Sequence, residues 1–349
     1  MSGMKARTTM KDIARAAGVS SVTVHKAIYS KKGVSSETRD KILRLAEAMD
    51  YSVNAAASSL KRGALHIAVV LQSVSNPVNY FFRSMWAGID KVERALLDYR
   101  VRLTRFECGD DWESQENILA GIAERKDIDG VVIQCWDETR LNGTINRLYD
   151  LGVPVVTANS DAVGSKRIAC VSGPNERIGR LAAELLRGFL PDGGKIVMMG
   201  GRPGVEIHNA HRRGFRAFIE ETGYSFPIVE VAGDGDPGRV RKDFSRALNG
   251  IGSGGVYAIT SRDTLLACRE IQERGLADRV RLVGSDVFRE LVPFFEQGVL
   301  RATVWKNQQA QAERAVLALY RYLTGRQAEW EPIGIGVVLR NNLEDFLQG

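Results

Sequence analysis

One short stretch near the amino terminus carries side chains suited to contact the edges of nucleic acid bases. If residues 20–28 form a helix, the 3.6-residue period places four of them on one face, namely Ser21, Val22, His25 and Lys26. The opposite face is apolar, with Val24, Ala27 and Ile28. Hydroxyl, imidazole and ammonium groups on an exposed helix face can hydrogen-bond to base edges and phosphates. The chemistry to look for is therefore recognition of a nucleic acid groove.

Three short helices are expected to position this face. Thr9 and Asp12 have the spacing of a capping box, Gly18 supplies the turn that ends the first helix, and the second helix begins at Ser20. Ser35 or Ser36 caps a third helix, SETRDKILRLAEAMDY. Its apolar side chains can close a small core over those of the first two helices: Ile42, Leu45, Ala46 and Met49 over Ile13, Val19, Val24 and Ile28. The pattern predicts a helix-turn-helix bundle.

The positive charge of the chain is concentrated in the same segment. Residues 1–62 contain twelve Lys and Arg against five Asp and Glu, a net charge of +7, whereas the whole chain with 48 and 42 has a formal charge of +6. The remainder is therefore close to neutral. Such asymmetry is typical of a module that binds phosphates. The alternative is a small helical cap on the following domain, with its charges merely solvated.

The segments MKDIARAAGVSSVTVHKAIYSKKGVSSETRDKIL and AEAMDYSVNAAASSLKRG resemble the DNA-binding headpiece and hinge of LacI/GalR (lac repressor) family transcriptional regulators. The resemblance implies that the second helix enters the major groove and reads bases through Ser21, Val22 and Lys26. The usual TVSR is TVHK here, so His25 and Lys26 depart from the family pattern, and Lys lacks the planar fork of Arg. The expected DNA-contacting residues of the headpiece are Thr9, Ser20, Ser21, Val22, Thr23, His25 and Lys26.

The linker NAAASSL, residues 54–60, has middling helix propensity and almost no apolar face, so it is a marginal helix by itself. The family resemblance implies that it becomes ordered when two copies meet in the minor groove and a Leu wedges between base pairs. Leu60 holds that place, and we add Asn54 and Ala57 to the expected DNA contacts. The alternative is a flexible linker with Leu60 packed against the following domain.

Length and composition predict an ordinary globular protein of two or three domains. The chain has 349 residues, of which 44% are hydrophobic and 26% charged. It shows no signal-peptide pattern and no run of eighteen uncharged apolar residues, so we expect a cytoplasmic protein without membrane contact. The four cysteines form no C-x-x-C pair, which indicates buried small side chains rather than a zinc or redox site. We expect neither a metal nor a cofactor.

From His66 onward, β-rich runs alternate with amphipathic helices, which predicts parallel sheets covered on both faces. Two doubly wound series follow each other, and this layout resembles the periplasmic sugar-binding proteins. That likeness implies three crossings between two lobes, near Ser172, Arg301 and Pro332. The expected domains are a headpiece at 1–53, a hinge at 54–63 and an effector-binding and dimerisation domain at 64–349. Within the last, the N-lobe takes about 64–172 and 303–331, and the C-lobe takes about 173–302 and 332–349.

A small-molecule effector is expected between the lobes, because open parallel sheets bind ligands beyond the carboxyl ends of their strands. The candidates at these ends are Phe81, Phe82, Gln134, Trp136, Asn159, Asn209, His211, Thr260, Asp286 and Lys306. The resemblance implies that the two Phe rings lie against a sugar, although one of them can instead belong to the core. Asp286 can instead cap the following helix. Departures from the family pattern argue against ribose and favour a sugar or sugar acid, with Lys306 as partner of the acid group.

Enzymatic motifs are missing. We find no G-x-G-x-x-G after a first strand, no Walker lysine, no G-x-S-x-G and no H-E-x-x-H. An enzyme that used the expected cleft would need an acid or base there, and Asp161, Asp286 and Glu206 could serve, but nothing in the sequence singles them out. The sequence thus predicts a homodimeric repressor on a pseudo-palindromic operator, with induction or corepression by the effector. The alternatives are a solute-binding receptor, which has no use for a basic headpiece, a structural nucleic-acid protein and an enzyme regulated by DNA.

Overall fold

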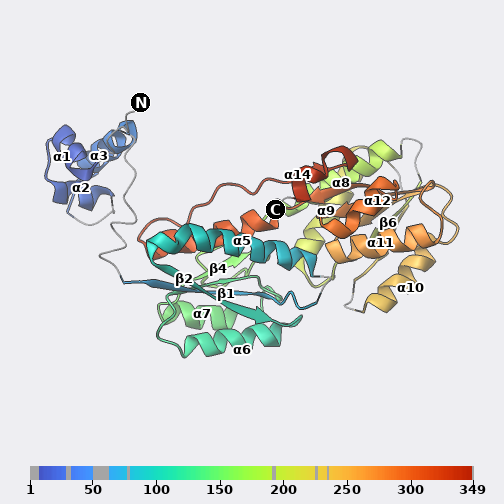
Figure 1. Cartoon of the computed structure of the whole chain (residues 1–349), viewed down its shortest axis with the longest axis horizontal. Coiled ribbons are helices and arrows are strands. Elements are labelled where there is room, and N and C mark those ends of the chain that lie inside the picture. Colours follow the sequence, from blue (N-terminus) through green and yellow to red (C-terminus); the bar gives the residue numbers. More distant parts are fainter. Residues whose placement is uncertain are drawn as a thin grey trace.

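The computed structural model describes residues 8–28, 33–49, 63–76, 79–190, 194–224, 227–233 and 236–347. Three short helices come first, followed by two α/β lobes that each contain one sheet (Figure 1). The expected fold class, a helical headpiece followed by two doubly wound lobes, is confirmed. Most of the expected hinge, including Asn54, Ala57 and Leu60, lies outside the described residues.

The headpiece helices are α1 (Met10–Ala17), α2 (Ser21–Ile28) and α3 (Ser36–Ala48). The capping box predicted for α1 is present, and Gly18 ends the helix with a left-handed φ of 71°. Lys41 of α3 donates to the terminal carbonyl of α1 at Ala17, at 3.0 Å, which satisfies one of the acceptors left open at a helix end. Ile13, Val24 and Ile42 are fully buried in the core that joins the three helices.

The first lobe contains a five-stranded parallel sheet in the order β2-β1-β3-β4-β5. Its strands are β1 (Leu65–Gln72), β2 (Val101–Cys108), β3 (Gly130–Ile133), β4 (Val155–Ala158) and β5 (Ala169–Val171). All of β1 is buried because alternate side chains face two helical layers. Ile67 and Val69 pack with α5 (Tyr80–Leu96) and α13 (Gln308–Leu323), whereas Ala68 and Val70 pack with α6 (Trp112–Ala123) and α7 (Asn142–Asp150). The turn η1 (Leu97–Tyr99) follows α5.

The second lobe contains a six-stranded sheet in the order β11-β10-β9-β8-β6-β7, parallel except for β11. Its strands are β6 (Lys195–Met199), β7 (Ile228–Val231), β8 (Gly254–Ala258), β9 (Val280–Ser285), β10 (Leu300–Trp305) and β11 (Gly336–Val338). Helices α8 (Asn175–Phe189) and α9 (Glu206–Glu221) cover one face. The other face is covered by α10 (Pro237–Leu248), α11 (Ser261–Glu273) and α12 (Val292–Glu296). Short turns complete the lobe, namely η2 (Arg289–Leu291), η3 (Arg340–Asn342) and α14 (Glu344–Leu347).

The second crossing between the lobes lies later than the position expected near Arg301. Strand β10 contains Arg301 and pairs with β9 of the second sheet as far as Val304. The chain returns to the first lobe only after Trp305, where α13 packs on β3, β4 and β5. The N-lobe segment expected from about 303 therefore starts after Trp305 in the structure. The error arose because the run RATVW indicates a strand but does not indicate which sheet it joins.

Helices α8 and α9 approach each other at two glycines. A Cβ atom at Gly179 of α8 would overlap the carbonyl oxygen of His211, and one at Gly214 of α9 would overlap that of Glu176. Only glycine allows this contact between the two backbones. The position of α9, and of the side chains it directs toward the other lobe, is therefore fixed by α8.

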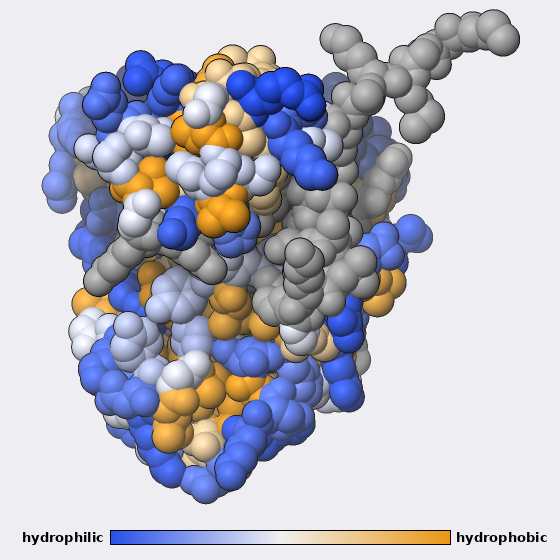
Figure 2. Space-filling model, turned by 90° about the vertical axis from the view of Figure 1, so that its left-hand side faces the viewer, coloured by the Kyte–Doolittle hydropathy of each residue, from blue (hydrophilic) through white to orange (hydrophobic). Residues whose placement is uncertain are grey.

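The described surface is hydrophilic over much of the side seen in Figure 2, with apolar residues gathered on the headpiece and in the lower part of the view. Val22 of the headpiece has 64% of its surface exposed, and Leu97 at the end of α5 has the same fraction.

Candidate functional site

The exposed face of α2 combines capping residues with outward-facing residues. The Ser20 hydroxyl accepts from the Thr23 backbone N–H at 3.1 Å and also hydrogen-bonds to the Thr23 hydroxyl. Thr9 caps α1 in the same manner. These three expected DNA contacts therefore hold helix ends in place. Ser21, Val22 and His25 are exposed, and Lys26 is half-buried beside Gly33.

The second candidate site is a cavity of about 170 Å³ between the lobes, which we call the cleft. This volume suits a ligand with one small ring, since a cavity of about 150 Å³ holds benzene. Its walls come from the carboxyl ends of strands in both sheets. Asn159 after β4 and Asp286 after β9 have left-handed φ values of 65° and 68°, which Asn and Asp adopt more readily than most residues. These turns direct the side chains into the cleft.

Nine of the ten expected effector residues line the cleft, namely Phe81, Phe82, Gln134, Trp136, Asn159, His211, Thr260, Asp286 and Lys306. Both phenylalanine rings contribute, and they contact each other edge to face with centroids 5.3 Å apart. Asn209 is the exception. It donates to the Pro203 carbonyl at 2.6 Å and accepts from Arg212, so it stabilises the loop before α9.

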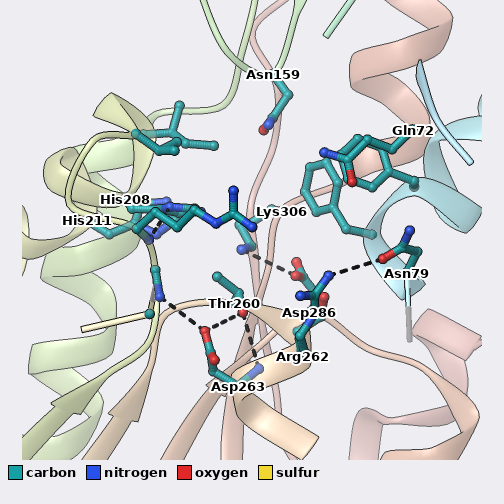
Figure 3. A pocket seen from close by; sticks show the side chains of 18 of the residues that line it. Gln72, Asn79, Asn159, His208, His211, Thr260, Arg262, Asp263, Asp286 and Lys306 are labelled. Atoms are coloured by element: carbon teal, nitrogen blue, oxygen red, sulfur yellow. Dashed lines mark hydrogen bonds and ion pairs between the residues drawn. The ribbon is translucent and has the colours of Figure 1, made fainter. Parts of the chain in front are cut away.

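Two neutral histidines form one side of the cleft, opposite Gln72 and Asn79 (Figure 3). Burial lowers the pKa of His208 to about 3, and Lys306 and Arg212 act in the same sense. Its Nδ1 accepts from the Arg202 backbone N–H at 3.0 Å, so the proton is on Nε2. Burial, together with Lys306 and His208, holds the pKa of His211 well below its ordinary value. Neither ring nitrogen of His211 has a hydrogen-bond partner in the described structure.

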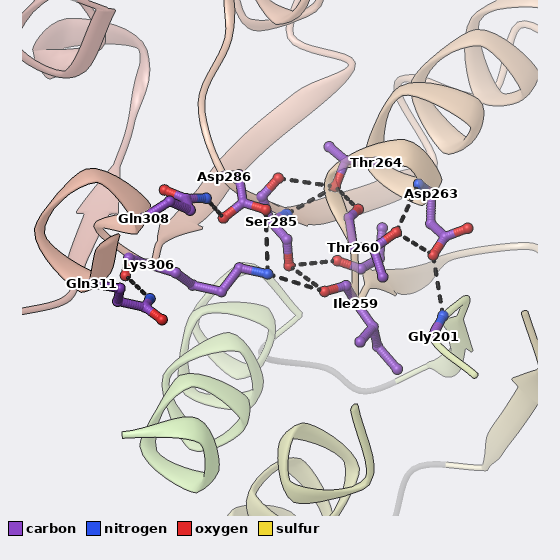
Figure 4. Close-up of polar contacts among 11 residues, drawn as sticks. Gly201, Ile259, Thr260, Asp263, Thr264, Ser285, Asp286, Lys306, Gln308 and Gln311 are labelled. Atoms are coloured by element: carbon purple, nitrogen blue, oxygen red, sulfur yellow. Dashed lines mark hydrogen bonds and ion pairs between the residues drawn. The ribbon is translucent and has the colours of Figure 1, made fainter. Parts of the chain in front are cut away.

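Lys306 belongs to a buried polar network at the base of the cleft (Figure 4). Its Nζ lies 3.2 Å from Asp286 Oδ2 and 3.4 Å from the Ile259 carbonyl, and Gln308 donates to the other Asp286 oxygen. Burial raises the pKa of Asp286, while Lys306 acts against that rise. A carboxylate of the protein thus already occupies the place expected for an acid group of the effector.

Asp263 is fixed at the start of α11 rather than directed at a ligand. It accepts from the Gly201 N–H at 3.1 Å and from the Thr260 hydroxyl, and Thr260 in turn caps α11. Burial raises the pKa of Asp263, and these hydrogen bonds oppose that rise. A Cβ atom at Gly200, whose φ is 82°, would overlap the Asp263 carboxylate. The glycines at 200 and 201 therefore allow the loop to reach Asp263.

Several cleft residues were missed by the sequence analysis, namely Gln72, Asn79, Arg202, His208, Arg262 and Asp263. Gln72 is the last residue of β1, so the rule of strand ends could have found it. His208 was missed because it lies in the first turn of α9, which begins at Glu206, and not at a strand end. His208 and His211 are three residues apart on that helix and share one face.

The lobes contact each other around the cleft. The rings of Tyr80 and Phe288 are stacked at 3.8 Å, with an interplanar angle of 8°. Arg262 donates to Asn79 at 3.3 Å, and the guanidinium of Arg202 lies 4.3 Å from the Trp136 ring centroid. Each pair joins one residue of the first lobe with one of the second, so the structure shows the lobes closed on the cleft.

Two of the candidate catalytic acids do not line the cleft. Burial acts to raise the pKa of Asp161, but hydrogen bonds from Arg167, Ala162 and Thr157 and the charge of Arg167 together outweigh it, and the pKa lies below its ordinary value. Glu206 forms an ion pair with Arg213 at 2.5 Å. Within the described residues, no group of three or more His, Cys, Asp and Glu side chains could hold a metal ion. No helix in the described ranges is long and apolar enough to span a membrane.

Comparisons with known proteins match both parts of the chain. Residues 9–54 match the lacI family of bacterial regulatory proteins, and residues 67–327 match a periplasmic binding protein domain. The HTH-type transcriptional repressor PurR of Vibrio vulnificus is 28% identical over 218 residues, 61% of either chain. The ribose operon repressor of Haemophilus influenzae is 33% identical over 131 residues, 37% of either chain. The matches thus span less than two thirds of these relatives.

Solved structures extend the likeness of the two lobes. A solute-binding protein of an ABC transporter from Agrobacterium vitis, bound with α-D-tagatopyranose, superposes with a TM-score of 0.72. The match covers 81% of this chain and 99% of that one at 18% sequence identity, which establishes the shared fold. With its regulatory headpiece and its periplasmic binding protein domain, this chain belongs to the lacI family of bacterial regulatory proteins.

Proposed function

We propose that this protein is a sequence-specific DNA-binding transcriptional repressor whose operator affinity is set by a sugar-type effector in the cleft. The headpiece supports the DNA-binding half of the proposal through its net positive charge and through the outward-facing Ser21, Val22 and His25 on α2. Val22 can contact a thymine methyl group, and Lys26 can reach a base or a phosphate. We also propose that Asn54, Ala57 and Leu60 contact the minor groove.

The observation that carries the effector-binding half is a set of buried polar atoms in the cleft that lack partners. These are both ring nitrogens of His211, the amide nitrogen of Gln72 and the amide oxygen of Gln134. Each buried group left without a hydrogen bond costs about 1–3 kcal/mol. A ligand with several hydroxyls would supply donors and acceptors to all three residues, and Phe81 and Phe82 offer apolar surfaces for the C–H face of a sugar ring.

The repressor acts as a homodimer on a pseudo-palindromic operator, because a single small headpiece makes too few contacts for useful specificity. The effector shifts the equilibrium between two lobe arrangements by binding one of them more tightly, and it can favour or disfavour DNA binding. A protein with this role works in the cytoplasm and needs no catalytic group. Asp161 and Glu206, which are held in ion pairs, have no catalytic part in the proposal.

The test is a DNA-binding measurement with and without candidate effectors. Genomic fragments are selected on the purified full-length protein, and fluorescence anisotropy then gives its affinity for the enriched fragment and for random duplex at moderate ionic strength. We expect a preference of at least a hundredfold for the enriched fragment, in line with specific binding by regulators. We also expect a sugar from a thermal-shift panel to change that affinity.

Equal affinity for enriched and random duplex, in every effector condition, would contradict the repressor proposal. Tight binding of a purine without binding of any carbohydrate would contradict the effector class. The second candidate function is a solute-binding receptor, favoured by the fold match to the Agrobacterium vitis protein. It predicts sugar binding without any DNA preference, so the same two measurements distinguish it.

A further inference from the structure

The cleft contains three cationic side chains, which differ in their partners. Lys306 is paired with Asp286 at 3.2 Å. Arg262 hydrogen-bonds to Asn79 at 3.3 Å and lies 3.7 Å from Asp110. The guanidinium of Arg202 has neither a hydrogen bond nor an ion pair among the described residues, and its contact is with the face of Trp136. Arg202 thus holds up to five N–H donors without an acceptor in a half-buried position.

The acids of the cleft are engaged by the protein itself. Asp286 forms an ion pair with Lys306 and accepts from Gln308, and Asp263 accepts from Gly201 and Thr260. Asp236 caps α10 through the backbone N–H groups that follow it, the first at 2.9 Å. The described structure therefore leaves a positive charge in the cleft without a matching carboxylate. Asp110 is near both Arg262 and Arg202, so one carboxylate faces two guanidinium groups, and an anion from outside the protein would balance the remaining positive charge.

The surroundings of Arg202 suit a bound anion. Burial lowers the pKa of Arg202, Asp110 acts in the opposite sense, and Arg262 adds to the lowering, so a second positive charge is near. The backbone of Arg202 also holds His208 in the form with a proton on Nε2, and both residues line the cleft. The Trp136 ring holds the guanidinium carbon of Arg202 4.3 Å from its centroid and accepts none of the N–H groups, which are left available for a two-point contact with an oxyanion.

We propose that the effector is an anionic sugar derivative and that Arg202 binds its carboxylate or phosphate group. This inference rests on the proposed effector role of the cleft and names the chemical class of its ligand. The sugar ring lies between the phenylalanines and the histidines, while the anionic group lies beside Trp136 and within reach of Arg262. Lys306 has no part in anion recognition, because Asp286 neutralises it.

The test compares neutral sugars with their acidic counterparts on the full-length protein at pH 7.5. The probes are D-glucose, D-glucuronate and glucose 6-phosphate, with the same series for D-galactose, and D-ribose with ribose 5-phosphate. Thermal shift identifies binders and calorimetry gives their affinities. We expect an acidic probe to bind at least tenfold more tightly than its neutral parent. Comparison of the carboxylate and phosphate series identifies the anionic group.

Two variants connect the preference to one residue. Arg202→Gln should weaken the binding of the acidic probe at least tenfold and leave the affinity for the neutral parent within about twofold of wild type. Arg202→Lys should retain part of the preference for the acidic probe because it keeps the charge. The matched control is Arg213→Gln. Arg213 is near Arg202 in the chain, in α9, but pairs with Glu176 and Glu206 and does not line the cleft, so its loss should leave all probe affinities unchanged.

Three results would overturn the inference. The first is that no acidic probe in the panel binds, and the second is that a neutral sugar binds as tightly as its acidic derivatives. The third is that Arg202→Gln lowers the affinity for neutral and acidic probes equally. The last would show that Arg202 serves only to hold the closed lobes together through Trp136. DNA preference of the wild-type protein is measured separately without probes. Its absence would contradict the repressor proposal and leave the anion preference standing.

Discussion

At the scale of single residues, we expect His211 to lower the stability of the free protein and to strengthen effector binding. Its ring is 2% exposed, uncharged and without hydrogen-bond partners in the described structure. We expect His211→Leu, which has a similar volume and no polar atoms, to raise the stability of the free protein by about 1 kcal/mol. The same change should weaken effector binding at least tenfold. Urea unfolding and calorimetry measure the two effects, and a destabilised variant with unchanged effector affinity would refute this role.

Lys26 permits a second prediction at this scale, because its two possible DNA contacts have different signatures. If its ammonium contacts a base, Lys26→Ala should cost about 1–3 kcal/mol and relax the preference at one operator position. If it contacts a phosphate, affinity should fall equally on all sequences, and the slope of log K against log salt should shrink by about one. Lys126→Ala in the first lobe is the charge-matched control. An unchanged affinity would remove Lys26 from the DNA contacts.

At the scale of elements, the packing of α8 on α9 depends on glycine at the crossing. Gly214→Ala would place a methyl group on the Glu176 backbone, so we expect a loss of about 1–3 kcal/mol or more in the free energy of unfolding. Gly188→Ala is the matched control, because it lies in α8 with no neighbouring atom within 4 Å of the added Cβ. That change should be neutral or stabilise by up to about 1 kcal/mol. Similar unfolding midpoints for both variants would contradict the packing argument.

The elements were easier to predict than the side chains they bring together. The run HIAVVL and its counterparts are apolar and bounded by turns, so the strands and their carboxyl ends could be located. The ion pair of Lys306 with Asp286 was missed, because it joins the ends of two different strands and depends on register. Arg262 was missed for another reason. It is in the first turn of α11, and its contact with Asn79 depends on how the lobes face each other.

At the scale of the whole molecule, the contact between the lobes brings the carboxyl group of Glu138 in the first lobe close to Glu206 in the second. Burial raises the pKa of Glu138 to about 7, and Glu206, Asp161 and Asp137 act in the same sense. A backbone hydrogen bond from Glu206, the first residue of α9 in the other lobe, opposes the rise. The protonated carboxyl fits the closed form, whereas the carboxylate is repelled by the acids around it.

The pH dependence follows from that direction. Because folding raises the pKa of Glu138, its contribution to the free energy of unfolding is fully present below about pH 4.5 and is lost as the pH rises through about 7. We expect Glu138→Gln to be more stable than wild type at pH 8 by about 1 kcal/mol, a figure reduced for the partial exposure of the group. The difference should disappear as the pH falls below about 4.5. Glu329→Gln, at an exposed site, is the control, and a pH-independent difference for Glu138→Gln would contradict the assignment.

The crossing after β10 has a consequence for engineering this protein as a biosensor. Lys306 lines the cleft, Asn307 caps α13 with a φ of 52°, and Gln308, the first residue of α13, donates to Asp286. The ligand-facing position and the start of the long helix are thus only two residues apart. Substituting Lys306 to change the ligand specificity would therefore also change how DNA binding responds to the ligand. Libraries for new inducers should vary Trp136, Arg202 and His208 and leave residues 306–308 intact.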